Sequence, residues 1–291
     1  MSSYYFNYVC GDTLDLKMVK HIPKEYLILT DRSKDTILFK ASTNSRVTKE
    51  IIQTLIDNGS KVNHKDEYGG NFLLNLCYNR ELTVDLLKYG LSLGFKITDT
   101  NRLNYTPLHV VSQVNGPHFD ELFKFLLEQG ANINAENIHG ETPLYYYCRS
   151  NVMNQSVLEQ FIGAGAVLHH KEFKELVSKS PLTVEYLKYC IQHGKDVVGP
   201  ESDALSYIAM RNPQVINDEL IQTFLDHGQD IHRPHSLFSP LKHLCNNLKS
   251  TPEQIRCLIR HGAHYGKEDN DEHSAYSILK YHKKQEFADS I

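Results

Sequence analysis

Residues 137–144 read Asn137-Ile-His-Gly-Glu-Thr-Pro-Leu144, and residues 126–134 just before them read Leu126-Leu-Glu-Gln-Gly-Ala-Asn-Ile-Asn134. These two stretches decide the fold, because each contains a landmark that returns along the chain. Thr142 followed by Pro143 is typical of a helix start, since threonine caps the first turn and proline fits where no N–H bond is needed. Gly130 after an apolar run is typical of a helix end, because glycine adopts the left-handed conformation readily.

The glycine landmark recurs at a nearly constant interval. It stands in a repeated phrase of two apolar residues, two others, glycine, two others and one apolar residue, with Gly90 or Cys190 in place of an apolar residue in two copies. The glycines are Gly59, Gly94, Gly130, Gly165, Gly194, Gly228 and Gly262, at spacings of 35, 36, 35, 29, 34 and 34 residues. A period of this length indicates an array of short structural repeats.

The helix-start landmark recurs in the same phase. Thr106, Thr142 and Ser239 each precede a Pro-Leu pair, and looser copies begin at Thr36, Asn71, Asp203 and Ser274. Each copy predicts one short helix, followed by a second helix, such as residues 120–127, that ends at the glycine.

This unit resembles the ankyrin repeat, in which a turn and two antiparallel helices recur about every 33 residues. The resemblance covers residues 34–268, about seven units, the fifth of them degenerate. Residues 1–33 and 269–291 are expected to form partial repeats that cap the ends, because a terminal unit otherwise exposes an apolar face. The resemblance implies an all-α solenoid with N- and C-terminal caps. In overall style the chain also resembles ankyrin effectors that intracellular bacteria deliver into host cells, and some viral host-range proteins.

Six residues after each helix start, the chain places a mostly small side chain, as close packing of neighbouring helices requires. These residues are Ser42, Cys77, Ser112, Cys148, Val177, Ala209 and Cys245. The six cysteines include no CxxC pair, which favours reduced thiols in a cytoplasmic compartment. His109 completes a Thr-Pro-Leu-His motif, where the resemblance implies a structural hydrogen-bonding role.

Loops between units correspond to the hairpin fingers of ankyrin repeats. They are predicted around residues 31–35, 66–70, 101–105, 137–141, 233–238 and 269–273. Only three residues lead from Leu168 to Lys171, the expected start of the fifth unit, and six lead from Val197 to Asp203. We therefore expect one finger to be absent and the next to be shortened. This irregularity has three open explanations: neutral drift, room for a partner segment, or a change of local curvature.

Composition narrows the function. The 291 residues are 41% hydrophobic, which is too apolar for a disordered chain, and no apolar run reaches the roughly 18 residues of a membrane helix. A net charge of −4 with scattered basic residues disfavours nucleic-acid binding. The N-terminus lacks the basic and apolar regions of a signal peptide. We expect a monomer in the cytoplasm, with delivery into the cytosol of a host cell as an open alternative.

Catalytic motifs are missing from the sequence. It contains no GxxxxGK[ST] or HExxH, and its glycines follow the repeat phase. Several histidines are paired, but no complete set of zinc ligands is visible in the sequence, so no cofactor or metal is expected. The alternative to a binding protein is an enzyme or metal site at the interrupted finger row, around residues 168–172.

The favoured function is a non-catalytic scaffold that binds a partner protein. In the architecture implied by the resemblance, fingers and first helices line a concave face whose exposed side chains packing does not dictate. The side chains expected to be exposed there are Arg32, Tyr68, Arg102, Tyr105, His139, Lys40, Asn75, Tyr78, Asn79, Gln113, Tyr146, Arg149, Tyr207 and His243. Tyr and Arg dominate binding hot spots. The predicted partner-binding residues are Tyr68, Tyr78, Arg102, Tyr105, His139, Tyr146, Arg149 and Tyr207. Within Tyr145-Tyr-Tyr147, Tyr147 is expected in the core and Tyr145 at the motif-histidine position.

Overall fold

The computed structural model describes residues 2–12, 14–150, 154–179, 182–199, 202–232, 239–266, 274–282 and 288. Every regular element in these residues is a helix, and the two β pairings are single bridges, Thr30 with Thr36 and Leu168 with Gly194. This confirms the predicted all-helical class. The chain forms two compact units, Met1–Ala166 (unit 1) and Val167–Ile291 (unit 2). The predicted fingers at 233–238 and 269–273 lie outside the described residues.

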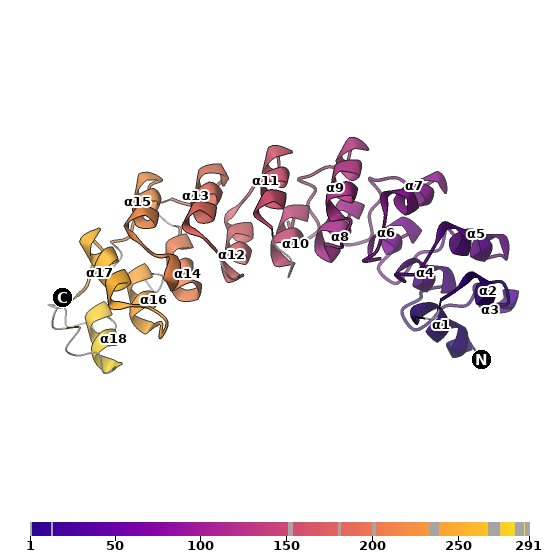
Figure 1. The fold of residues 1–291 in the computed structure, drawn as a ribbon, viewed down its shortest axis with the longest axis horizontal. Coiled ribbons are helices and arrows are strands. Elements are labelled where there is room, and N and C mark those ends of the chain that lie inside the picture. The colour runs from indigo at the N-terminus through magenta and orange to yellow at the C-terminus, as the bar shows by residue number, and fades with distance from the viewer. Residues whose placement is uncertain are drawn as a thin grey trace. The chain divides into compact units, whose positions relative to one another are not determined.

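Unit 1 is built from short first helices that alternate with mostly longer second helices. Its elements are α1 (Ser2–Cys10), α2 (Leu16–Val19), α3 (Lys24–Leu27), α4 (Ile37–Ser42), α5 (Lys49–Asp57), α6 (Phe72–Cys77), α7 (Val84–Ser92), α8 (Pro107–Val114), α9 (Phe119–Glu128), α10 (Pro143–Arg149) and α11 (Gln155–Gly163). The first helices α4, α6, α8 and α10 pack on one another in chain order, and α7 packs on α9 (Figure 1). Two rows of helices result, as the repeat predicts.

Local side-chain chemistry explains where these helices begin and end. The side chains of Thr36, Asn71, Thr106 and Thr142 each accept a hydrogen bond from the backbone N–H three residues ahead, which caps the first helix. The second helices are followed by glycines with φ between +85° and +114°, namely Gly59, Gly94, Gly130 and Gly165. These left-handed residues turn the chain back toward the next unit.

The core of unit 1 lies between the two rows. The small residues that follow each helix start, Ser42, Cys77, Ser112 and Cys148, are at most 1% exposed, as predicted. Larger rings fill the space beside them: the ring centroids of Phe123 and Phe161 are 4.5 Å apart, and those of Phe119 and Tyr147 are 5.5 Å apart. Small side chains thus let first helices approach one another, while aromatic rings join them to the second helices.

Unit 2 repeats the arrangement with more departures. Its elements are α12 (His170–Ser178), α13 (Val184–His193), α14 (Ala204–Arg211), the 3-10 helix η1 (Pro213–Val215), α15 (Asp218–Asp226), α16 (Pro240–Asn246), α17 (Pro252–Arg260) and α18 (Ala275–Tyr281). Helices α12, α14, α16 and α18 pack in series, as do α13, α15 and α17. The departures are concentrated at the start of the unit.

The segment around Leu168 contains no loop of finger length. Helix α12 begins at His170 with His169 as its cap, two residues before the start expected at Lys171. The backbone N–H of Lys195 donates to the carbonyl oxygen of Leu168 at 2.7 Å. Gly194 has φ −82° and does not form the left-handed turn of the other repeat glycines.

None of the described helices is both long enough and apolar enough to span a lipid bilayer.

Candidate partner-binding face

Four finger turns in unit 1 share one construction. Each begins with Asp or Asn, whose side-chain Oδ1 accepts hydrogen bonds of 2.8–3.0 Å from the backbone N–H groups two and four residues ahead. The first residues of the turns are Asp31, Asp66, Asn101 and Asn137. The fourth residues, Lys34, Gly69, Asn104 and Gly140, have φ between +60° and +78°. A side-chain acceptor followed by a left-handed residue is a self-contained tight turn.

Neighbouring fingers are joined through their backbones. The N–H of Arg102 donates to the carbonyl oxygen of Tyr68 at 2.9 Å, and the N–H of Ile138 donates to that of Leu103 at 3.1 Å. The fingers at 66–70, 101–105 and 137–141 therefore form one connected strip, which holds their outward side chains in a defined order.

Side chains from the first helices form ion pairs and hydrogen bonds with the acidic side chains of the finger turns. Lys40 Nζ lies 2.6 Å from the Asp35 carboxylate and 3.1 Å from that of Asp31. One unit later, Asn75 Nδ2 donates to Asp66 at 3.0 Å. Both helix residues stand four positions after the helix cap. Because the Asn75 side chain bonds within the protein and is 8% exposed, the expectation that it is exposed on the concave face is wrong.

Tyr146 occupies the same phase in a later unit. Its hydroxyl forms short hydrogen bonds with the Tyr105 hydroxyl and the Glu141 carboxylate, and it accepts one from Asn137 Nδ2 at 3.1 Å. Tyr146 is 5% exposed, so its predicted exposure is wrong. Burial, and after it the bond to Glu141, raises the pKa of Tyr146. Burial alone would raise the pKa of Glu141 too, but the bonds from Tyr146 and Asn137 lower it.

Asn79 was also expected on the exposed face, and the structure places it inside. Its side-chain N–H₂ donates to the carbonyl oxygens of Ser42 at 3.1 Å and Asn44 at 2.8 Å, and the residue is 2% exposed. In unit 2, Asn247 makes the equivalent bonds to Ala209 and Met210. An asparagine near the end of a first helix thus satisfies the free carbonyls of the preceding first helix.

His109 has the structural role that its motif implies. Its Nδ1 lies 2.8 Å from the hydroxyl of Thr106, and its Nε2 lies 3.1 Å from the carbonyl oxygen of Glu141 in the next finger. The side chain is completely buried, and that burial lowers its pKa. His109 therefore links a helix start to a finger turn.

Several large side chains of this region remain at the surface. Tyr68 is 56% exposed, Tyr78 43% and Ile138 53%. Arg102, His139 and Arg149 are exposed as well, while Tyr105 is half-buried. Ile138 was not predicted, although its place directly after the turn asparagine, equivalent to that of Arg32 and Arg102, could have indicated it.

The three consecutive tyrosines, residues 145–147, lie in three different environments. Tyr147 is fully buried, as expected, and Tyr145 is half-buried beneath the guanidinium of Arg149, whose Cζ lies 5.6 Å from the ring centroid. Arg149 is thereby held over an aromatic ring.

Tyr207, the remaining predicted contact, belongs to unit 2. Its half-buried ring lies between two cations, with Lys174 Nζ and Arg211 Cζ each 5.7 Å from the centroid. It therefore belongs to a different unit from the other seven predicted residues, all of which lie in unit 1.

The alternative site around residues 168–172 is an ion cluster in unit 2. Asp203 at the start of α14 accepts hydrogen bonds from two residues of α12, His170 Nε2 at 2.5 Å and Lys174 Nζ at 2.8 Å. Glu172 is buried and accepts a bond from the backbone N–H of His169, so it caps α12. These contacts join and cap helices.

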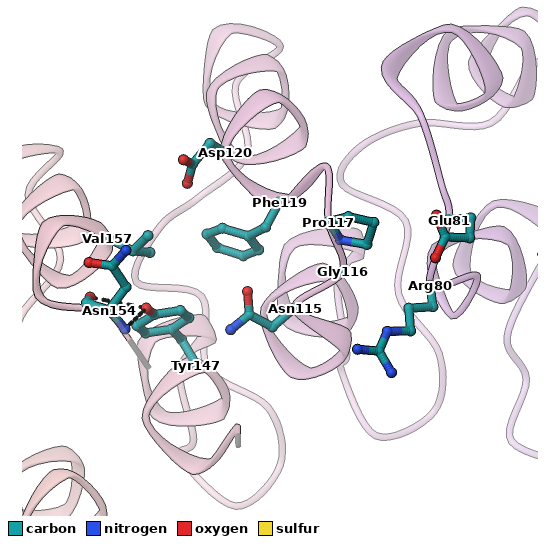
Figure 2. Close-up of a pocket in the computed structure, with 10 residues that line it drawn as sticks. All are labelled: Arg80, Glu81, Asn115, Gly116, Pro117, Phe119, Asp120, Tyr147, Asn154 and Val157. Carbon is teal, nitrogen blue, oxygen red and sulfur yellow. Dashed lines mark hydrogen bonds between the residues drawn. The ribbon is translucent and has the colours of Figure 1, made fainter. Parts of the chain in front are cut away.

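A surface cavity of about 600 Å³ lies on the loops between paired helices of unit 1 (Figure 2). It is lined by Arg80, Glu81, Asn115, Gly116, Pro117, Phe119, Asp120, Tyr147, Asn154 and Val157. The loops after α6 and α8, Tyr147 of α10, and the starts of α9 and α11 supply these residues. None of the predicted partner-binding residues lines it.

Comparison with known proteins agrees with this geometry. Residues 103–138 match the family model described as ankyrin repeat. A 103-residue stretch is 36% identical to the ankyrin repeat protein OPG189 in two Variola virus sequences, covering 35% of this chain and 18% of the relative. The aligned stretch is thus less than a fifth of the relative's length.

Proposed function

We propose that this chain, whose residues 103–138 match the ankyrin repeat, is a non-catalytic scaffold that binds a partner protein through unit 1. The proposed contact surface, called the finger face below, consists of the exposed side chains Tyr68, Tyr78, Arg102, Ile138, His139 and Arg149. Ankyrin repeats generally mediate protein–protein interaction, and unit 1 contains the matched repeat.

One observation carries the proposal: large exposed side chains project from fingers whose backbones are hydrogen-bonded to one another in the unbound chain. Tyr68 and Ile138 are more than half exposed, yet their fingers are connected through residues 101–105. Tyrosine, arginine and large apolar side chains bury much area on binding. A preorganised backbone reduces the ordering cost of association, so more of that area contributes to affinity.

Tyr105 and Tyr146 have a positioning role in this proposal. Their hydroxyls bond to each other and, through Tyr146, to Glu141 of a finger turn. They hold the finger face in shape, and of the two Tyr146 is buried and Tyr105 is half-buried. Tyr207 is outside the finger face because it belongs to unit 2.

We place the interaction in the cytosol of a host cell. All six cysteines are free thiols, and three of them, Cys77, Cys148 and Cys245, fill core positions at which small residues are needed. The relative OPG189 is a viral protein. Both observations support action among the host's own cytosolic proteins.

Photo-crosslinking tests the proposed surface directly. The full chain with p-benzoylphenylalanine in place of Tyr68 should form an adduct with a partner in host cytosol, because Tyr68 would lie within the interface. The same group in place of Tyr281, which is 84% exposed on α18 of unit 2, provides a matched control.

Affinity for the crosslinked partner then measures the contribution of the finger face. Tyr68→Ala combined with Tyr78→Ala should weaken binding at least about tenfold, since two hot-spot rings are lost, and Tyr281→Ala should leave it unchanged. Adducts from position 281 but not from 68, or equal affinity of the double variant and the wild type, would refute the assignment.

A further inference from the structure

Three side chains with metal-ligating atoms converge in unit 2. Cys257 and His261 lie four residues apart near the end of α17, so they share one face of that helix. Asp218 begins α15, the neighbouring second helix, which packs against α17 (Figure 1). One ligand atom from each residue falls within 4.8 Å of the other two.

The separations suit a small tetrahedral ion. Cys257 Sγ lies 3.2 Å from Asp218 Oδ1, and His261 Nδ1 lies 3.5 Å from the same oxygen. Zinc bonds of about 2.0–2.3 Å at tetrahedral angles place neighbouring ligand atoms about 3.3–3.7 Å apart. The N···O separation of 3.5 Å already lies in this range, and the S···O separation of 3.2 Å needs to lengthen by about 0.3–0.5 Å, because the longer Zn–S bond places sulfur and oxygen about 3.5–3.7 Å apart.

We propose that Cys257, His261 and Asp218 bind a zinc ion, with water as a fourth ligand. Thiolate, imidazole and carboxylate are the three protein ligand types that zinc takes. The thiol of Cys257, which donates its hydrogen to Asp218 in the metal-free chain, gives up that proton to solvent when zinc binds. His261 Nδ1 also lies 2.9 Å from the carbonyl oxygen of Cys257, a contact that coordination through this nitrogen replaces.

The surroundings of the site leave one side open for a zinc ion to enter, and they contain one cation that competes with zinc for Asp218. Cys257 is 3% exposed, whereas the side chain of Asp218 is 62% exposed, so the ion enters on the Asp218 side. Arg260 is the competitor: its Nη2 lies 3.1 Å from Asp218, while its Nη1 lies 2.8 Å from Glu253. Zinc displaces the first contact and leaves the second intact.

His227 supplies a control from within the same unit. It stands at the end of α15 as His261 does at the end of α17, and its Nδ1 makes the same contact to the carbonyl oxygen four residues back, at 2.8 Å. At that earlier position, however, α15 has Thr223 in place of a cysteine. Loss of His227 removes the helix-end contact without removing a zinc ligand.

The test is titration of the full chain with Co²⁺ and then Zn²⁺, in a Cys10→Ser background because Cys10 is exposed. One equivalent of Co²⁺ should produce a thiolate charge-transfer band in the near ultraviolet, and Zn²⁺ should abolish it. Cys257→Ser should eliminate the band. His261→Gln should weaken binding at least about tenfold, since a ligand is lost, and His227→Gln should bind as the background protein does.

Two further variants make the result independent of any folding defect in Cys257→Ser. Asp218→Asn, at an exposed position, should weaken Co²⁺ binding, and Arg260→Gln should strengthen it because the competing cation is gone. The proposal fails if the background protein shows no saturable band, if the band survives in Cys257→Ser, or if His227→Gln weakens binding as much as His261→Gln does.

Discussion

At the scale of single residues, hydrogen-bonding partners decide which side chains reach the surface. The resemblance correctly implied a structural His109, and repeat phase correctly indicated a buried Tyr147. It failed for Asn79 and Tyr146, whose partners include atoms 37 and 41 residues away. The position of a residue in the repeat identifies the side of the helix on which it lies. It does not show whether the neighbouring unit provides a carbonyl or hydroxyl group that can hydrogen-bond to the side chain and bury it. The Asp218 group was missed for the same reason, since its cysteine partner is 39 residues away.

The buried imidazole of His109 makes stability depend on pH. Its folded-state pKa is lowered by burial, so protonation favours the unfolded chain, whose histidine titrates near pH 6.5. Stability from neutral His109 is therefore complete above about pH 7 and declines as pH falls through about 6.5. His109→Gln should cost about 1–2 kcal/mol at pH 7.5, where hydrogen bonds to Thr106 and Glu141 are impaired.

Urea unfolding of both proteins between pH 7.5 and 5 checks this expectation. The stability difference should shrink toward low pH, because only the wild type loses stability by protonating this residue. A difference that is constant, or grows, as the pH falls would show that His109 is not buried in its neutral form.

At the scale of elements, helix boundaries were predictable wherever local chemistry sets them. Thr-Pro-Leu at 106 and 142 marks the caps seen in the structure, because both the cap bond and the proline act within one turn. The prediction failed at α12, where His169 and Glu172 form a reciprocal cap two residues early. Histidine is an unusual cap, so the sequence offered no signal there. The Asp/Asn at the first position of each finger was a usable signal.

The loops between paired helices give a test of backbone approach. A Cβ added to Gly116 would lie 2.1 Å from the carbonyl oxygen of Arg80, and both residues line the cavity in Figure 2. Gly116→Ala should therefore force the two loops apart and cost about 2–3 kcal/mol. Gly163 ends α11 with no atom within 4 Å of such a Cβ, so Gly163→Ala should be neutral or stabilise by up to about 1 kcal/mol. Thermal unfolding distinguishes them, and equal effects would contradict the loop contact.

At the scale of the whole molecule, the period of the sequence identified the repeats but not the division into two units. The boundary follows Ala166, just before the segment that has no finger. Seven of the eight predicted contact residues lie in unit 1, and Tyr207 lies in unit 2. We therefore assign the proposed contact surface to the finger face of unit 1 alone, and not to all eight residues together. The caps predicted at residues 1–33 and 269–291 and the count of about seven repeats stay predictions.

Hydrogen–deuterium exchange of the full chain, alone and with its crosslinked partner bound, tests the finger face most directly. We predict slower exchange in residues 66–80, 101–114 and 137–149, which contain the fingers and first helices, and unchanged exchange in α7, α9 and α11 on the other row. Protection confined to those second helices, or to residues 167–291, would contradict the account.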